Sequence, residues 1–269
     1  MGDDPLGDAE KVVGVAARLI EIAGDDPDAK AAAKSIARSA RTVATTIEVC
    51  LLPLAAVNFG YKKAREYFEV QFQADIQAKL DKIPEESLVE PKPSVAAPIL
   101  QGLGFSIEET PLKNMYLSLL ASSMDGRNLG KVHPSFSEIV RQLTADEASM
   151  FSDLFRIGTA LPLATLQHGA VGAIGKRDLS RHLAGLKRDD SIYWHDSVPI
   201  MLENFQRLGL VEIRYDTYLT ADGTYDWVTQ HPEYVRQSTI VDDMANVSIL
   251  KGVARRTSFG EAFKIAAID

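Results

Sequence analysis

The spacing of apolar residues changes near Leu161, and this change constrains the fold more than any other feature of the chain. Before it, apolar residues recur about one helical turn apart, as do Phe68, Phe72 and Ile76. After it, short apolar runs predict strands that alternate with short helices. We therefore expect a mainly α-helical protein, with an all-helical region over residues 1–158 and an α+β region over residues 160–269.

The helical region is predicted to contain a long kinked helix and a connector. Residues 28–83 are rich in alanine, and Pro53 should kink this span because proline lacks a backbone donor and clashes with the carbonyl four residues back. Three prolines in residues 82–94 predict a connector. Further helices are expected from about 94 to 103 and from 112 to 124.

The most apolar stretch, residues 43–60, raises the question of a membrane span. It approaches the roughly 20 residues of a transmembrane helix only by including Glu48, Pro53 and Asn58. A carboxylate in mid-span is costly, so a helix packed inside the protein is favoured. A conditional membrane or partner contact is the alternative, through the apolar residues Ile47, Leu51, Leu54 and Phe59.

Charge and cysteine content exclude several classes of protein. The net charge is -8, which argues against a general attraction to nucleic acid or to anionic lipid. The single cysteine, Cys50, excludes an internal disulfide framework and a cysteine-rich zinc site. The first ten residues lack the positive start and apolar core of a secretory signal. A cytoplasmic location is the expectation.

The order of elements in the α+β region is that of a winged-helix domain. Residues 198–215 predict a helix that runs into a strand through a turn at Gly209, and residues 245–267 predict a strand, a turn and a final helix. This order suggests a winged-helix-like fold, and a fold alone does not identify a function.

A basic cluster lies in the segment GKRDLSRHLAGLKR, in which residues 178–186 are predicted to form a short helix. Such a helix could lie along a nucleic-acid backbone. The neighbouring carboxylates Asp178, Asp189 and Asp190 favour a solvated helix face instead. The candidate contact residues are Lys176, Arg177, Arg181, Lys187 and Arg188.

The chain lacks the sequence patterns that announce a catalytic or metal site. The five histidines lie apart, without HExxH or Cys-His spacing, although His182 and His195 could meet near Asp178 or Asp196. The segment HGAVGAIGK continues with Arg177, where a phosphate-binding loop needs Ser or Thr. We expect no enzymatic activity, no metal and no cofactor.

The stretch 130–151 predicts two helix starts rather than an active site. Pro134 fits a first helical turn, and His133 then lies at or just before the cap. Thr144 and Glu147 have the spacing of a capping box, in which each side chain accepts a backbone N–H of the other residue.

Four segments together resemble a known family: YLSLLASSM at 116–124, VHPSFSEIVRQLTADEASMF at 132–151, LGLVEI at 208–213 and TSFGEAF at 257–263. They resemble the Abi-alpha (abortive infection alpha) proteins, a bacterial family that also carries the domain name DUF4393. The resemblance implies a role in abortive infection or phage defence, and it implies no reaction and no catalytic residues.

The sequence leads to three hypotheses, of which the first comes from the resemblance. The first is a cytoplasmic defence protein that acts by binding an unknown protein partner or phage component. The second is a winged-helix regulator that binds nucleic acid through residues 176–188, and the third is an effector that meets a membrane through residues 43–59. An oligomer is compatible with each of them.

Overall fold

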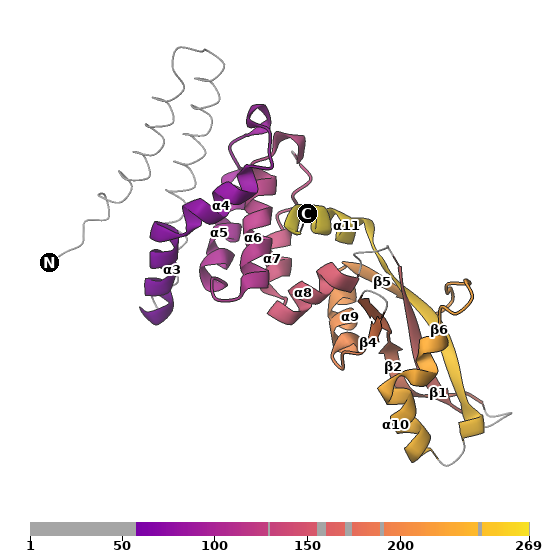
Figure 1. Ribbon diagram of the computed structural model, residues 1–269. Helices are drawn as coiled ribbons and strands as arrows, with labels where there is room; N and C mark the ends of the chain where they lie inside the picture. Colours follow the sequence, from indigo (N-terminus) through magenta and orange to yellow (C-terminus); the bar gives the residue numbers. More distant parts are fainter. Residues whose placement is uncertain are drawn as a thin grey trace, which may run out of the picture. The chain divides into compact units, whose positions relative to one another are not determined.

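The computed structural model describes residues 58–128, 130–154, 160–169, 174–188, 191–241 and 244–268, and for 58–61, 187, 188 and 191 it describes the backbone alone. These residues divide between two compact units (Figure 1). The first unit ends at Ser149 and resumes at Ala262, and the second is Met150–Glu261. The sequence-based division at residues 158–160 cuts the chain once, whereas the last helix of the structure returns to the first unit.

The described part of the first unit is helical and is centred on α6. Eight residues of α6 are buried, and α4, α5 and α7 pack against it (Figure 1). The helices predicted at 94–103 and 112–124 are confirmed by α5 and α6. The elements are α3 (Asn58–Val70), α4 (Phe72–Leu80), η2 (Glu85–Ser87), α5 (Pro93–Phe105), α6 (Thr110–Ser123), η3 (Gly126–Asn128), α7 (Phe136–Arg141) and α8 (Ala145–Leu154).

The connector predicted at residues 82–94 is confirmed. Residues 82–83 form a turn after α4, η2 is a single turn, residues 88–92 contain no helix, and α5 begins at Pro93. Leu88 forms an isolated bridge with Asp125, and the Val89 N–H donates to the Met124 carbonyl at 2.8 Å. These contacts fix the connector to the end of α6.

The second unit is built on an antiparallel sheet of four strands in the order β2-β1-β6-β5. The strand predicted after residue 160, the helix that runs into a strand at Gly209 and the final strand and helix are all confirmed. The elements are β1 (Ala160–His168), β2 (Arg177–Leu183), α9 (Val198–Arg207), β5 (Val211–Arg214), η4 (Asp226–Gln230), α10 (Pro232–Ile240), η5 (Met244–Asn246) and β6 (Val247–Arg256), with β3 (Leu186–Arg188) and β4 (Ser191–Tyr193) forming a separate hairpin. Helix α11 (Ser258–Ala267) begins in this unit and belongs to the first unit from Ala262.

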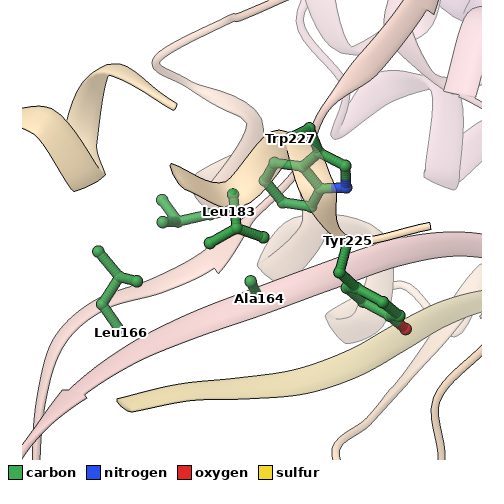
Figure 2. Close-up of a cluster of buried hydrophobic side chains, with 6 residues drawn as sticks. Ala164, Leu166, Leu183, Tyr225 and Trp227 are labelled. Carbon is green, nitrogen blue, oxygen red and sulfur yellow. The ribbon is translucent and has the colours of Figure 1, made fainter. Parts of the chain in front are cut away.

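Strand β1 is buried on both faces of the sheet, because successive side chains of a strand point to opposite faces. On one face, Ala164 and Leu166 lie in a core cluster with Leu183, Tyr225 and Trp227 (Figure 2). Val228 of η4 completes this cluster. The segment from Tyr225 to η4 therefore covers this face of the sheet.

The helix predicted at residues 178–186 is wrong, because Arg177–Leu183 is strand β2. Its pairing with β1 contains two register shifts, which interrupt the regular alternation of apolar residues. Leu183 is buried in the core cluster and Leu179 packs against it. Packing against a sheet therefore decides the local structure here. The fold is mixed α+β rather than mainly α, and the winged-helix assignment stays a prediction.

The TSFGEAF segment begins helix α11, and its contacts show why residue 260 is a glycine. The Thr257 hydroxyl accepts the Gly260 N–H at 2.8 Å and donates to the Gly209 carbonyl at 2.6 Å. A Cβ at Gly260 would lie 1.9 Å from the Leu210 carbonyl oxygen, so only glycine allows this approach. In the first unit, Phe263 meets Phe136 edge to face, with ring centroids 5.4 Å apart.

Candidate functional site

A pocket of about 330 Å³ lies in the first unit between α5 and α7, and we call it the α5–α7 pocket. Helix α5 contributes residues spaced one turn apart, α7 contributes one face, and α6 contributes a single tyrosine. The lining residues are Pro98, Gln101, Gly102, Phe105, Tyr116, Ser137, Glu138 and Arg141.

The contact between Gly102 and Tyr116 shapes the floor of the pocket. A Cβ at Gly102 would lie 2.3 Å from the Tyr116 ring, so the ring can lie here only because position 102 has no side chain. Tyr116 is almost fully buried, and its hydroxyl donates to the Ser137 carbonyl at 3.3 Å. Burial raises the pKa of Tyr116, Glu138 raises it further and Arg141 opposes this effect. The floor is therefore closed, and almost none of the tyrosine ring is left for a ligand to contact.

The rim of the pocket is polar and electrically balanced. Arg141 Nε donates to Glu138 Oε2 at 2.8 Å, and both side chains are exposed. Gln101 is half-buried, and among the described residues its carboxamide makes no hydrogen bond. The Phe105 side chain is 58% exposed, which makes it an aromatic edge that solvent or a ligand can reach. The pocket thus combines an exposed aromatic edge with an unused amide.

His133 stabilises the helix that forms one wall of the pocket. Its Nδ1 accepts the Ser135 backbone N–H at 3.1 Å and lies 2.7 Å from the Ser135 hydroxyl. Helix α7 begins at Phe136, so Pro134 lies in the preceding turn rather than in the first helical turn. The prediction that His133 has a structural role at a helix start is confirmed.

The capping box predicted for the next helix is also confirmed. The Thr144 N–H donates to Glu147 Oε2 at 2.8 Å, and the Glu147 N–H donates to Thr144 Oγ1 at 3.1 Å. Glu147 is buried, so the pair satisfies two backbone donors that the helix start would otherwise leave without partners.

Two further histidines repeat the role of His133 in the second unit. His195 Nδ1 accepts the Ser197 N–H at 3.3 Å before α9, and His231 Nδ1 accepts the Glu233 N–H at 3.1 Å at the start of α10. Burial lowers the pKa of His231, which favours the neutral ring that this acceptor role requires. Sequence reasoning proposed no such role for these two residues.

His182 belongs to a buried polar network on the sheet face opposite the core cluster. The Thr165 hydroxyl donates to Tyr215 Oη at 2.9 Å, and Tyr215 Oη lies 3.0 Å from His182 Nδ1. With the tyrosine proton directed to Nδ1, the imidazole proton is left on Nε2, 3.7 Å from Glu203 Oε1. His182 has φ 55°, a conformation rare outside glycine, at a register shift of β2. The bulge turns this ring under α9.

The electrostatics of this network favour an uncharged state. Burial lowers the pKa of His182, Arg181 lowers it further and Glu203 partly opposes this. Burial also raises the pKa of Tyr215. The hydrogen bonds link β1, β2 and the chain after β5, and α9 faces them through Glu203. The arrangement fixes the sheet and holds no charged nucleophile.

The sequence left open whether His182 and His195 meet, and in the structure each has other partners. His182 faces Tyr215 and Glu203, whereas His195 is engaged at the start of α9. Over the parts of the chain that the structure describes, no three His, Cys, Asp or Glu residues are grouped so that they could hold a metal ion.

The basic cluster comes to lie on strands and in the loop before them. Lys176 Nζ donates to Ser248 Oγ at 2.9 Å, and exposed Arg181 lies 3.4 Å from Asp178. Arg177 is exposed at the start of β2, and Lys187 and Arg188 belong to β3. The structure provides no helix here that could enter a groove of nucleic acid.

The proposed membrane or partner helix falls largely outside the described residues. Ile47, Leu51 and Leu54 lie outside them, and Phe59 is part of α3 with only its backbone described. Among the helices that the structure does describe, none combines the length and the apolar character needed to cross a membrane.

Comparison with known proteins assigns a family. Residues 64–267, most of the chain, match the family model described as abortive infection alpha. The chain belongs to the abortive infection alpha family. No curated protein and no solved structure matches it. This membership confirms the resemblance, and it links the chain to abortive infection and anti-phage defence.

Two of the segments that carry the resemblance to the abortive infection alpha family contribute to the pocket. Tyr116 belongs to the first segment, and Ser137, Glu138 and Arg141 belong to the second. Sequence reasoning placed Tyr116 within the helix predicted at 112–124 and gave no role to Gln101 or Gly102. The only available signal was a glycine within an apolar helix, which on its own indicates close packing and not a pocket.

Proposed function

We propose that the chain is a bacterial, cytoplasmic abortive infection protein that acts by binding a partner through the α5–α7 pocket. The observation that carries this proposal is the pocket itself, an exposed aromatic edge beside a few converging polar groups. Its lining comes in part from the segments that carry the family resemblance, which supports a link between the site and the defence role.

Binding rather than catalysis is supported by how the titratable groups are used. His182, the most buried histidine, is 5% exposed and makes its hydrogen bonds within the protein. His133, His195 and His231 each use Nδ1 to accept a backbone N–H at a helix start. A general base needs a free lone pair within reach of the substrate proton, and these four rings use Nδ1 for the fold.

Phage infection of cells that express variants from the native locus would test this proposal. Phe105→Ala together with Arg141→Ala should remove the aromatic edge and one rim charge while leaving the buried core intact, since both side chains are exposed. We expect protection against phage, measured as plating efficiency and cell survival, to fall by at least about tenfold, the equivalent of about 1.4 kcal/mol of binding free energy.

The matched control is Val70→Ala, because Val70 is 71% exposed in the same unit and does not line the pocket. Circular dichroism melts of the purified variants should coincide with that of the wild type. If the pocket variant is folded and protects cells as well as the control does, the proposal is wrong.

A further inference from the structure

We infer that the α5–α7 pocket receives an extended peptide segment of a protein partner, with Gln101 hydrogen-bonded to the peptide main chain and one apolar side chain against the exposed Phe105 ring. This inference rests on the proposed function and names the chemistry of its partner.

The Gln101 carboxamide is the group that favours a peptide as the ligand. It offers a donor and an acceptor side by side, and among the described residues neither has a hydrogen-bond partner. A peptide main chain carries the matching pair, because every residue except proline has one N–H and one carbonyl. Covering a half-buried amide without hydrogen bonds to it would be costly, so a ligand that fills the pocket must supply them.

Phe105 determines what can lie beside this amide. Gly102 and Tyr116 are buried and close the floor, so the apolar surface that a ligand can reach is the Phe105 ring, which is 58% exposed. The volume of about 330 Å³ is near the lower end of the roughly 300–1,000 Å³ range of ligand pockets. The space therefore suits one anchoring side chain rather than a large ligand, and an aromatic ring would also contact the exposed Phe105.

Charge distinguishes a peptide from a nucleic acid. A carboxamide can also pair with the edge of a nucleobase, and the exposed Phe105 ring could stack on its face. Nucleic-acid binding gains most of its affinity from cations that neutralise phosphates. The one cation of the pocket, Arg141, is already paired with Glu138, so the lining carries no net positive charge. An uncharged main chain matches this rim better than a phosphodiester does.

Amide NMR of the full chain, titrated with N-acetyl-phenylalaninamide as the probe, would test the inference. We expect saturable shifts of the Gln101 side-chain amide and the Gly102 backbone amide. Gln101→Ala should weaken binding by about tenfold, the loss expected for two neutral hydrogen bonds of about 0.7 kcal/mol each. Gln77→Ala is the matched control, because Gln77 is exposed on α4 and bonds only to Asp81.

Two further probes test whether the ligand is a peptide. The fully N-methylated analogue of the probe keeps the ring but has no N–H, so it should bind at least about fivefold more weakly. Adenosine should cause no saturable shift at Gln101. Equal binding of the methylated analogue, tighter binding of adenosine, or no saturable shift with any probe would each overturn the peptide inference.

The two proposals fail in distinguishable ways. If phage protection depends on Phe105 and Arg141 but the amide probe does not bind at Gln101, the peptide inference is wrong and the proposed function stands. If the probe binds at Gln101 but protection is unchanged in the pocket variant, the proposed function is wrong and the pocket remains a peptide site without a role in defence.

Discussion

The clearest prediction for the stability of the second unit concerns Glu233 of α10. Its carboxylate accepts Arg236 Nε at 2.7 Å, Arg236 Nη2 at 2.6 Å and Gln237 Nε2 at 2.9 Å, and it also pairs with the Ser180 hydroxyl of β2. The hydrogen bonds from Arg236 are the main reason that the pKa of Glu233 falls from 4.5 to about 2, and burial partly opposes them. The perturbation is Glu233→Gln, which removes the charge and keeps the shape.

The expected magnitude follows from the pKa. A fall from 4.5 to about 2 corresponds to roughly 3 kcal/mol at 1.36 kcal/mol per pKa unit. Arg236 is 57% exposed, so solvent screening should reduce this to about 1–2 kcal/mol. Because the folded-state pKa is depressed, the stabilisation is fully present above about pH 4.5 and is lost as the pH falls toward 2.

Urea unfolding followed by tryptophan fluorescence is the assay. Trp194 and Trp227 are the only tryptophans of the chain, and both belong to the second unit, so the emission reports on that unit. We expect Glu233→Gln to lower the unfolding free energy by about 1–2 kcal/mol at pH 7 and by much less at pH 2.5. Glu212→Gln, at an exposed site on β5, is the control. An equal loss at both pH values would refute the reasoning.

Three further predictions test single contacts. Thr144→Ala and Glu147→Gln should each cost about 1 kcal/mol, and the double variant should cost less than their sum because both break one reciprocal pair; additive losses in urea unfolding would contradict this. Gly260→Ala should cost about 2 kcal/mol or more, since its Cβ would meet the Leu210 carbonyl, and an unchanged thermal midpoint would contradict this. Burial lowers the pKa of His231, so the stability that its neutral ring contributes should be lost as the pH falls below about 6.5; His231→Asn should flatten the fall in unfolding free energy between pH 7.5 and 5.5, and parallel profiles would argue against the role.

Local signals in the sequence were sufficient to predict where helices α7 and α8 begin. Thr144 and Glu147 satisfy backbone donors within one turn of their own helix, so their spacing alone predicts the hydrogen bonds. The same holds for His133, whose partner Ser135 is two residues away. Interactions of this kind depend little on the remainder of the fold.

Strand β2 could not be predicted in this way. Its charges Asp178 and Arg181 have the i,i+3 spacing of a helix surface, and its two register shifts conceal the alternation of a strand. What makes it a strand is burial of Leu183 beside Trp227, more than forty residues away in the sequence. A contact across such a separation depends on the tertiary fold.

The α5–α7 pocket was missed for a related reason. Gln101 carries no charge and belongs to no motif, and it becomes notable only because the structure leaves its amide without a partner. In the sequence, Gly102 indicates only a locally less stable helix. The structure shows that its lack of a side chain makes room for Tyr116 of another helix. Neither position can be recognised before three helices are placed together.

Helix α11 makes the assembly of the protein depend on the order of its synthesis. Phe136 and Phe263 are both fully buried against each other in the first unit, yet the whole second unit lies between them in the chain. Domains of a growing chain generally fold in sequence from the N-terminus. Here a ribosome must translate past Phe263 before the first unit can complete its core, so chains that stop early leave Phe136 uncovered.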